Sequence, residues 1–487
     1  MVFLDQKVWA GKIYSGGWVA GSGSEYDCVE PATGATLARV GAASPADVAK
    51  AAERASQAQP EWAALTYDAR AVVLRRAAKL FLDHEEEILY WMMRESGTGR
   101  RFATGQIRQG AAEECWEAAG LAGAPYGELL RSNKQRLSMA RRLPVGAVGV
   151  IAPFNAPIIL AIRALAPALA LGNAVVLKPD PRTAICGGVV FARVFEEAGL
   201  PEGVLSVLPG GVEVGQAIVE DPQIPLISFT GSTRTGKAIA RAAADRLKRV
   251  HLELGGNSAL IVLDDVDLES AVSAGAFGSF HHSGQVCMAT SRHLVAASIA
   301  DAYAAALAEH ANRLPVGDPT KQEVALGPII DARQRDNVHR IVTSSVDAGA
   351  KLAAGGTYEG LFYRPTVLTE VPVTAPAYTE EIFGPVAPVT PFSTIDEAVQ
   401  LAKTTEYGLS LGILTRDVMR GMEIAERIPS GLVHINDQTV NDEALIPFGG
   451  VKESGTGIRA GGIDANLDAY TNTQWVTVRG DLPSYPF

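Results

Sequence analysis

Apolar runs and amphipathic stretches alternate regularly between residues 145 and 254. Short runs typical of buried strands are separated by longer segments in which apolar residues recur every three or four positions, as on one helix face. We expect strands at 145–152, 174–178, 205–208, 226–230 and 250–254, with helices between them at 158–170, 184–198, 215–220 and 235–244. This alternation predicts right-handed crossovers and a parallel sheet with helices on both faces.

The segments on either side of this region show other patterns. Ser44 and Pro45 form an N-cap signal that opens an alanine-rich helix reaching about Gln59. The further elements that we expect are short strands and turns over 1–45 with a turn at 30–34, a helix over 67–95 with Leu74, Ala77, Ala78 and Phe81 on one face, a helix over 103–121, an extended polar arm over 129–144, a second α/β region after Cys287 with a strand from 294 and helices over 300–313 and 333–348, and a β-rich segment over 470–478. The pattern as a whole predicts an α/β protein.

Three polar turns follow predicted strands, where the ligands of parallel α/β sheets bind. Asn155 lies between two prolines, so its amide is either a rigid donor for an oxyanion or a partner of its own turn. Lys178 ends a buried strand and either binds a ribose or phosphate or is simply solvated. Gly231 and Ser232 open a helix whose N-terminus suits a phosphate, although a plain helix cap looks almost the same. Neither a G-x-G-x-x-G nor a P-loop pattern follows a strand.

Cys287 and Glu253 carry the strongest chemical signal. Only a thiolate is a strong nucleophile, and the turn at Gly284 lets backbone N–H groups face an oxyanion formed when Cys287 attacks a carbonyl. Glu253 lies among apolar residues and two glycines, so burial would raise its pKa and suit it to act as a general base. Taken singly, Cys287 could be a small buried hydrophobe. The pair together favours catalysis.

Composition excludes several classes of function. The 487 residues suffice for two or three domains, and the formal net charge of −11 argues against binding to nucleic acid or anionic membranes. The first 18 residues lack a secretory signal, and Arg163 and several prolines interrupt the apolar window 151–177, so we expect a cytoplasmic protein without a membrane span. The four cysteines are far apart and have no histidine at ligand spacing, so neither disulfides nor a metal site is expected.

Seven motifs follow one another in the order typical of one family. They are Pro153-Phe154-Asn155, Lys178-Pro179, Phe229-Thr230-Gly231-Ser232-Thr233, Glu253-Leu254-Gly255-Gly256-Asn257, Gly284-Gln285-Val286-Cys287, Glu381-Ile382-Phe383-Gly384-Pro385 and Pro447-Phe448-Gly449-Gly450. Through these motifs the whole chain resembles the NAD(P)-dependent aldehyde dehydrogenase superfamily. The stretches 178–180, 431–438 and 485–487 look most like the bacterial benzaldehyde dehydrogenases of aromatic degradation.

The resemblance implies a fold and a mechanism. The implied parts are a Rossmann-like parallel-sheet cofactor-binding domain (1–128 and 145–252), an α/β catalytic domain (253–450) and a small β oligomerisation arm (129–144 and 470–487) that joins subunits into a homodimer or homotetramer. Cys287 would attack the aldehyde, Asn155 would hold the oxyanion, hydride would pass to the nicotinamide, and Glu253 would activate water to hydrolyse the thioester. The cofactor-binding residues implied by motif are Lys178, Ser232, Gly231, Glu381, Phe383, Phe154 and Gly255, and no metal is implied.

Two positions depart from the family pattern. Pro181 replaces a glutamate with which many NAD-preferring relatives grip the adenosine ribose, while Asp180 restores some repulsion against a 2′-phosphate. NAD is therefore expected, and NADP use stays open. Arg163 stands where relatives often place a large apolar residue, and we expect it to pair within the fold rather than to meet a substrate carboxylate.

The expected substrate is a benzaldehyde-like aromatic aldehyde, which would be oxidised to the acid. The same mechanism could serve hydroxylated aromatic, aliphatic or semialdehyde substrates. A coenzyme A-acylating enzyme is less well supported, because Glu253 supplies a hydrolytic base. A cofactor-free cysteine hydrolase would need His281 or His282 as the partner of Cys287 and would leave the strand-end motifs unused. A non-catalytic protein of this fold would have no use for Cys287, Glu253 and Asn155.

Overall fold

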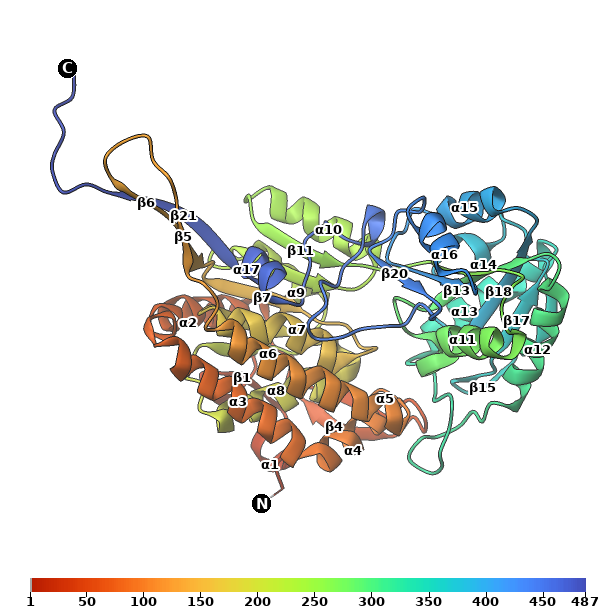
Figure 1. Ribbon diagram of the computed structural model, residues 1–487. Coiled ribbons are helices and arrows are strands. Elements are labelled where there is room, and N and C mark those ends of the chain that lie inside the picture. Colours follow the sequence, from red (N-terminus) through yellow and green to blue (C-terminus); the bar gives the residue numbers. More distant parts are fainter. Residues whose placement is uncertain (1) are drawn as a thin grey trace.

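Two seven-stranded sheets organise the chain, which the computed structural model describes over residues 2–487 (Figure 1). The first sheet has the strand order β11-β10-β7-β8-β9-β1-β2. Its strands are β1 (Lys12–Ser15), β2 (Trp18–Ala20), β7 (Ala147–Ile151), β8 (Ala174–Lys178), β9 (Leu205–Val207), β10 (Leu226–Thr230) and β11 (Arg249–Glu253). Strands β7 to β11 are parallel, whereas β1 and β2 are antiparallel additions at one edge.

The predicted alternation of strands and helices is confirmed in this sheet. Strands β8 and β10 have the predicted bounds, and every residue of β8 is buried because a parallel sheet is covered on both faces. From β7 the chain steps to β8 and β9, and then returns past β7 to β10 and β11. The strand order therefore reverses between β7 and β10, and ligands of such sheets bind in the crevice at the carboxyl ends of these strands.

Helices cover the first sheet, and we call this sheet with its helices the first body. The helices are α1 (Gln6–Trp9), α2 (Pro45–Ala64), α3 (Tyr67–Asp83), α4 (Glu85–Glu95), α5 (Arg100–Gly105), a π-helix (Gln106–Ala112), α6 (Glu113–Leu121), α7 (Pro157–Ala170), a 3₁₀ turn (Pro181–Thr183), a second π-helix (Ile185–Val189), α8 (Val190–Ala198), α9 (Val212–Glu220) and α10 (Thr233–Ala244). Helix α7 packs against α3 and α6, whereas α9 packs against α2 and α10. The predicted apolar face of α3 is fully buried.

Two long helices end elsewhere than predicted. The helix expected over 67–95 is two helices, because His84 has φ −110° and ψ 19° and leaves the helical conformation between α3 and α4. Helix α2 continues beyond residue 59 although Pro60 lies within it. Its last turns include the buried Trp62, whose indole N–H donates to Leu169 O over 2.9 Å. Tertiary packing of this ring outweighs the local effect of the proline.

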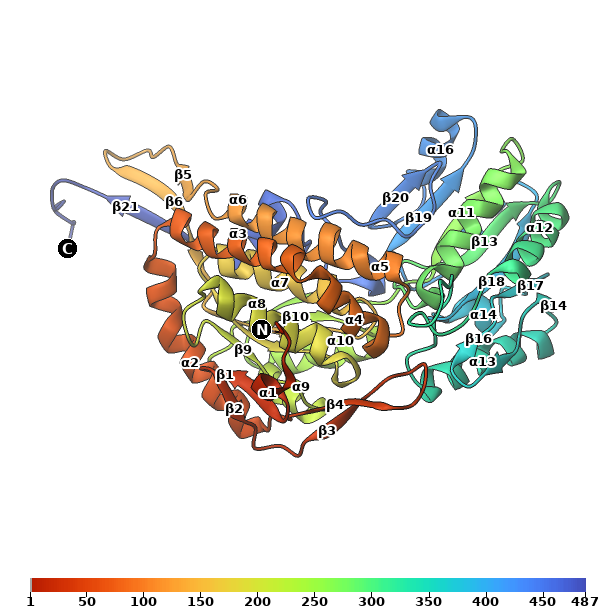
Figure 2. The same ribbon diagram turned by 90° about the horizontal axis from the view of Figure 1, so that it is seen from below.

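The second sheet has the order β14-β17-β18-β13-β12-β19-β20 and, with its helices, forms the second body beside the first (Figure 2). Its strands are β12 (Ser258–Val262), β13 (Thr290–Ala296), β14 (Lys351–Ala354), β17 (Thr366–Thr369), β18 (Val386–Phe392), β19 (Ser410–Leu414) and β20 (Leu432–Ile435). Its helices are α11 (Leu268–Phe280), a 3₁₀ turn (His281–Gly284), α12 (Ala300–Arg313), α13 (Ala332–Asp347), α14 (Pro376–Thr379), α15 (Ile395–Lys403) and α16 (Val418–Ala425). The region thus begins with β12, earlier than the predicted start after Cys287. The sequence did not reveal β12, because an apolar run of five residues has no periodicity by which a strand can be told from a helix.

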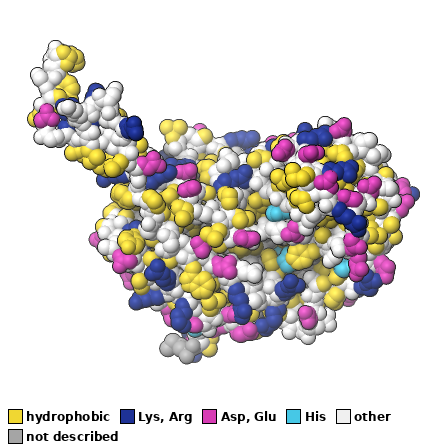
Figure 3. Space-filling view, in the orientation of Figure 1, with side chains coloured by type: hydrophobic (Ala, Val, Ile, Leu, Met, Phe, Trp, Pro, Cys, Tyr) yellow, Lys and Arg dark blue, Asp and Glu magenta, His cyan; other side chains and the backbone are white. Residues whose placement is uncertain are grey.

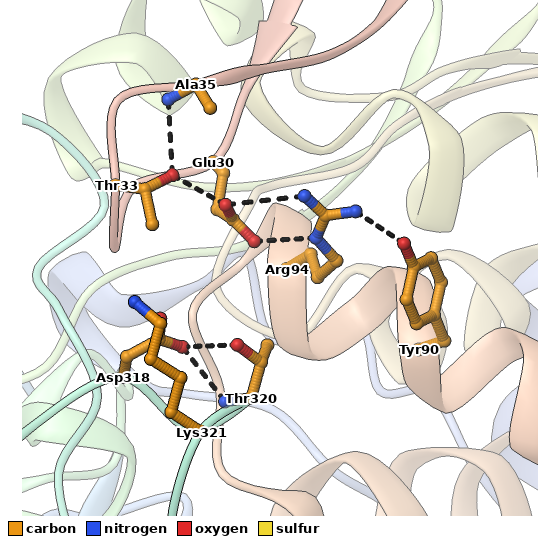
Figure 4. A network of polar contacts seen from close by, with 8 residues as sticks. All are labelled: Glu30, Thr33, Ala35, Tyr90, Arg94, Asp318, Thr320 and Lys321. Carbon is orange, nitrogen blue, oxygen red and sulfur yellow. Dashed lines mark hydrogen bonds and ion pairs between the residues drawn. The ribbon is translucent and has the colours of Figure 1, made fainter.

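Two short hairpins complete the bodies: β3 (Tyr26–Val29) with β4 (Thr36–Val40), and β15 (Tyr358–Glu359) with β16 (Phe362–Tyr363). The turn after β3 is fastened by Glu30, which accepts hydrogen bonds from Arg94 Nε at 2.7 Å and Thr33 Oγ1 at 2.5 Å (Figure 4). Burial would raise the pKa of Glu30, but these bonds outweigh burial and lower it. Asp318 and Thr320 of the second body lie next to this group (Figure 4), so the predicted turn lies where the two bodies meet.

An antiparallel three-stranded arm projects from the first body (Figure 1). It consists of β5 (Gly127–Leu129), β6 (Leu137–Pro144) and β21 (Thr471–Val478). A 3₁₀ turn (Lys452–Ser454) and α17 (Ile463–Tyr470) precede β21 in the chain. The predicted extension of residues 129–144 from the main body is confirmed. Exposed apolar side chains gather on this arm and the tail beyond it (Figure 3), among them Leu129, Trp475, Leu482, Tyr485 and Phe487. Over residues 2–487, no helix combines the length and apolarity needed to cross a membrane.

Candidate active site

The carboxyl ends of four strands of the first sheet carry polar residues. Lys178 and Glu253 are the final residues of β8 and β11, and Asn155 and Ser232 lie in the turns that follow β7 and β10. Since the strands are parallel, their carboxyl ends share one edge of the sheet. Four positions predicted as site residues therefore lie along the crevice where the strand order reverses.

Cys287 approaches this edge from the second body. It lies on the loop that leads into β13, and Gln285 O on the same loop accepts a hydrogen bond of 2.9 Å from Asn155 Nδ2. Because Asn155 belongs to the first body, this bond fixes the cysteine loop against the first sheet. A carboxamide has two N–H donors, so one remains beside the backbone N–H groups of the cysteine loop. Two such donors can stabilise one oxyanion.

The loop before Cys287 has an unusual backbone. His282, Ser283 and Gly284 all have left-handed φ angles, of 49°, 54° and 66°. Ser283 Oγ donates to Gly327 O over 2.8 Å, and a Cβ on Gly284 would lie 2.1 Å from Gly384 O, so only glycine fits there. Non-glycine residues in this region cost roughly 1–3 kcal/mol each and persist where the surroundings determine them. The fold therefore fixes the approach of the thiol in advance.

The Cys287 side chain is partly exposed and packs against a small apolar cluster. The buried members of this cluster are Val286, Met288, Ala289, Leu409, Leu432 and Phe448. Burial, followed by the charges of Glu381, Glu253 and Asp442, raises the pKa of the thiol to about 12, and the N–H of Met288 counteracts this only in part. The thiol is therefore neutral near pH 7, and nucleophilic attack requires removal of its proton.

Glu253 is a buried carboxylate with one free oxygen. Its Oε1 lies 3.1 Å from Nε2 of His251, which precedes it by two residues on β11 and so projects from the same face of the strand. Its Oε2 is buried without a hydrogen-bond partner in the described part of the chain. Burial raises the pKa of Glu253, while His251, Arg163 and Arg459 act in the opposite direction. A carboxylate with a raised pKa is suited to accept a proton from water.

Glu381 lies against the glycines that follow Glu253. Its Oε1 accepts a hydrogen bond of 3.0 Å from the backbone N–H of Gly256, and a Cβ on Gly255 would lie 2.2 Å from its Oε2. Glycine at position 255 therefore lets the carboxylate reach the main chain. Burial raises the pKa of Glu381 to about 7, although the bond from Gly256 opposes this.

Phe154 and Phe383 form an edge-to-face pair, with ring centroids 5.9 Å apart and planes at 73°. Phe383 has a left-handed φ of 52°, and the Arg182 guanidinium lies 4.1 Å from the centre of the Phe154 ring. Arg182 also forms ion pairs of 2.8 Å with Asp180 and 2.7 Å with Asp331. The second of these pairs joins the two bodies beside the aromatic pair.

Lys178 and Ser232 lie farther along the crevice. Lys178 is buried, its Nζ donates to Pro179 O over 3.2 Å, and burial lowers its pKa although the charges of Asp180 and Glu213 oppose this. Ser232 caps α10 by accepting a hydrogen bond from the N–H of Thr235. The N-terminus of α10 is the positive end of the helix dipole and suits an anion.

Arg163 is paired within the fold, as expected from the sequence. Its guanidinium forms ion pairs of 3.2 Å with Glu114 and 2.5 Å with Asp442, and donates to Glu443 O over 3.0 Å. It also lies 4.9 Å from the centre of the Phe448 ring, on the edge of the cluster that contains Cys287. Two carboxylates thus compensate its positive charge close to the thiol.

Comparisons with known proteins identify the family of this chain. The model of the aldehyde dehydrogenase family matches residues 18–476. The chain belongs to this family. It is 61% identical to a vanillin dehydrogenase from an Amycolatopsis strain over the whole of both chains, and 47% identical to a benzaldehyde dehydrogenase (NAD(+)) from Pseudomonas putida over 99% of each. A salicylaldehyde dehydrogenase from Pseudomonas putida G7, solved in complex with salicylaldehyde, has a TM-score of 0.94 at 35% identity, covering 98% of this chain and 99% of that one.

The positions of the two histidines nearest to Cys287 in the sequence weaken the cysteine-hydrolase alternative. Within residues 2–487 the structure shows no hydrogen bond from Cys287 to His281 or His282. Burial lowers the pKa of His281 to about 4 and of His282 to about 3, and His282 contacts the Phe102 ring with centroids 4.7 Å apart. Neither histidine is placed to activate the thiol. The same part of the chain holds no cluster of three or more His, Cys, Asp or Glu side chains that could bind a metal ion.

Three further residues of this candidate site were not expected from the sequence. Gln285 anchors the cysteine loop, and its side-chain oxygen accepts the N–H of Ile330 over 3.0 Å. His251 contacts Glu253, and the alternation of side chains along β11 could have revealed this contact. Asp442 pairs with Arg163 from a distant loop, for which the sequence holds no signal.

Proposed function

We propose that this enzyme oxidises aromatic aldehydes to carboxylic acids with NAD+, using Cys287 as nucleophile, Asn155 as oxyanion donor and Glu253 as general base. The observation that carries the proposal is that a fixed amide and a buried carboxylate both lie close to one thiol: Asn155 is bonded to Gln285 of the cysteine loop, and the charge of Glu253 acts on Cys287. The balanced reaction consumes aldehyde, NAD+ and water, and yields acid, NADH and a proton.

The first step joins the substrate to the protein. The thiol of Cys287, which is partly exposed, gives its proton to solvent, and its sulfur bonds to the carbonyl carbon, so the carbonyl oxygen becomes an oxyanion. The second N–H of the Asn155 amide and the backbone N–H of Cys287 stabilise that charge, since the first amide N–H is bonded to Gln285 O. A bound NAD+ would supply the acceptor for the hydride that leaves this carbon, and the substrate would then remain on Cys287 as a thioester.

The second step releases the acid. Glu253 takes a proton from a water molecule through its free Oε2, and the hydroxide attacks the thioester carbon. The carbon–sulfur bond then breaks and Cys287 is regenerated. A raised pKa makes Glu253 a stronger base than an exposed carboxylate. This base distinguishes the proposed hydrolytic enzyme from a coenzyme A-acylating one.

The residues of the crevice fit a dinucleotide. Lys178 and Glu381 would bind its two riboses, Gly231 and Ser232 would contact the pyrophosphate at the N-terminus of α10, and Phe383 with Phe154 would pack beside the nicotinamide ribose. The absence of a side chain at Gly255 keeps Glu381 accessible there, because a Cβ would lie 2.2 Å from its carboxylate.

NAD is the proposed cofactor in preference to NADP. Asp180 and Glu213 both act electrostatically on Lys178, so a 2′-phosphate on the adenosine ribose would meet two negative charges. The nearby Arg182 is compensated by Asp180 and Asp331 and offers no free cation. The name of the benzaldehyde dehydrogenase (NAD(+)) relative supports the same choice.

The substrate class follows from the relatives and from the surroundings of the thiol. The names of all three compared proteins specify aromatic aldehydes. Phe448 and the other apolar members of the Cys287 cluster suit an aromatic ring. Because Glu114 and Asp442 already compensate Arg163, a substrate carboxylate would gain no free cation there. We therefore favour benzaldehydes, with or without a ring hydroxyl, over aliphatic aldehydes and acidic semialdehydes.

We propose that the two bodies and the arm have separate functions. The first body (1–128 and 145–252) binds the cofactor, the second (253–450) carries the catalytic cysteine, and the arm with the tail (129–144 and 470–487) joins subunits into a homodimer or homotetramer. The exposed apolar side chains of the arm support an interface. The four free cysteines accord with a cytoplasmic location, where thiols stay reduced.

The test is a set of initial-rate measurements of NADH and NADPH formation with benzaldehyde, vanillin, hexanal and succinic semialdehyde. The Cys287→Ala variant serves as control, and light scattering reports the mass of the assembly. Turnover of the two aromatic aldehydes with NAD+, abolished in the variant, is the expected result. Preference for hexanal or the semialdehyde would overturn the substrate class, preference for NADP+ would overturn the cofactor assignment, and a monomeric mass would overturn the proposed assembly.

A further inference from the structure

His251 is a buried histidine with one clear contact. It is 2% exposed, and its Nε2 lies 3.1 Å from Glu253 Oε1. Its other ring nitrogen, Nδ1, is buried without a hydrogen-bond partner in the described residues. On its far side the imidazole meets the Tyr470 ring edge-on, with centroids 6.5 Å apart and planes at 70°. Packing against α17 therefore fixes the ring and aims Nε2 at the carboxylate.

The hydrogen bond between His251 and Glu253 has a defined donor and acceptor. When Glu253 is ionised it can only accept hydrogen bonds, so the imidazole donates from Nε2 and leaves its lone pair on Nδ1. This assignment matches the unpartnered state of Nδ1, which as a neutral acceptor costs less to bury than an N–H donor on a charged ring. Only one carboxylate oxygen is engaged, and the other stays available for water.

Other charged groups face Glu253 without forming hydrogen bonds to it. Arg163 on α7 and Arg459 on the loop before α17 both stabilise its ionised form. A Cβ on Gly449 would lie 2.9 Å from Glu253 Oε1 and 3.1 Å from Arg459 Nη1, so this guanidinium approaches the same oxygen as His251. Cys287 faces the carboxylate from the second body, and the Glu253 charge opposes ionisation of the thiol.

We propose that His251 is a positioning residue for the general base: it holds Oε1 of Glu253 by a hydrogen bond and so presents Oε2 to the hydrolytic water. This inference rests on the proposed role of Glu253. The histidine acts through the carboxylate and does not touch the substrate. Its loss should therefore slow hydrolysis of the thioester without slowing attack by Cys287 or transfer of the hydride.

Loss of the hydrogen bond has a second consequence that can be measured. The bond from His251 opposes the effect of burial on the pKa of Glu253. Without this bond, the pKa rises further, and the acidic limb of the turnover profile moves to higher pH. A shift of about one pH unit corresponds to a tenfold loss of the ionised base at a given pH on that limb.

The experiment compares His251→Phe, His251→Gln and Glu253→Gln with the unchanged enzyme. Phenylalanine keeps an aromatic ring against Tyr470 but removes the donor, whereas glutamine places an amide N–H near the position of Nε2. Rapid mixing with benzaldehyde and NAD+ separates the first turnover from the steady state. Turnover is then measured across pH 5–9, and thermal unfolding shows whether each variant is folded.

We expect His251→Phe to form the first equivalent of NADH at least as fast as the unchanged enzyme. On the acidic limb, which should lie about one pH unit higher, its steady-state turnover should be about tenfold slower. His251→Gln should restore both properties. Equal pH profiles for the Phe variant and the unchanged enzyme would overturn the inference, and so would a slower first turnover. Failure of a folded His251→Gln variant to restore turnover would also contradict it. Unimpaired steady-state turnover of Glu253→Gln would instead overturn the proposed role of Glu253.

Discussion

Replacement of Asn155 by alanine tests the oxyanion site directly. The amide uses one N–H to hold Gln285 O at 2.9 Å. In the proposed mechanism the other N–H stabilises the substrate oxygen. Removal of one donor from an oxyanion site slows the chemical step by about 10²–10³-fold, or roughly 3–4 kcal/mol of transition-state stabilisation. The same change also removes the hydrogen bond to Gln285 O. The free energy of unfolding should therefore fall by about 1–3 kcal/mol, because a buried carbonyl is left without a partner.

Asn173 supplies the matched control for this change. It is fully buried, and its Nδ2 donates to Ala168 O at 3.0 Å and to Tyr470 O at 3.1 Å, away from the cysteine loop. Asn173→Ala should lower stability at least as much as Asn155→Ala while the folded fraction keeps its rate. The assay is single-turnover NADH formation at saturating benzaldehyde, with unfolding by urea in parallel. If both variants slow the first turnover alike, or Asn155→Ala slows it less than about tenfold, the amide is not the oxyanion donor.

Three further predictions concern charge. Burial and nearby carboxylates raise the pKa of Cys287 to about 12, so its alkylation by iodoacetamide should accelerate about tenfold per pH unit from pH 7 to 9. Mass spectrometry measures this rate, and a plateau within that range would contradict the prediction. Glu213→Gln removes one of two negative charges acting on Lys178, so kcat/KM for NADP+ should rise several-fold relative to NAD+, and an unchanged ratio would refute the electrostatic account. Arg163→Met leaves Glu114 and Asp442 buried without their cation, so the free energy of unfolding should fall by about 3–5 kcal/mol at pH 8. Burial raises the pKa of Glu114 to about 7, so at pH 5 this carboxyl is already neutral and the loss in urea unfolding should be smaller; an equal or larger loss would be inconsistent with the argument.

The parallel core could be predicted because its strands are short and wholly apolar. β8 and β10 have the predicted bounds, since strands covered on both faces appear as continuous apolar runs between turn residues. The start of α2 was also visible, because Ser44 and Asp47 form a capping box whose pattern is local in sequence. Such signals act within a few residues and need no knowledge of the fold.

Other features depend on contacts that local patterns do not encode. The break at His84 divides a continuous helical pattern into two helices that pack on different neighbours. Arg163 could be expected to pair, but its partners Glu114 and Asp442 lie on a separate helix and a distant loop. The motifs could locate Cys287 and Glu253 in the chain. The bond between Asn155 and Gln285, which brings their bodies together, appears only in three dimensions.

The pairing of β6 with β21 also determines when the arm can fold during synthesis of the chain. Arg141 and Gln474 are hydrogen-bonded at 2.8 Å although 333 positions separate them. As the ribosome extends the chain, β6 has only the three-residue β5 as a partner, and a two-stranded hairpin is marginal in water. Leu467 and Tyr470 of α17, made just before β21, belong to the core of the first body. The nascent chain therefore carries an open strand edge and an unfinished core until the second body has been translated.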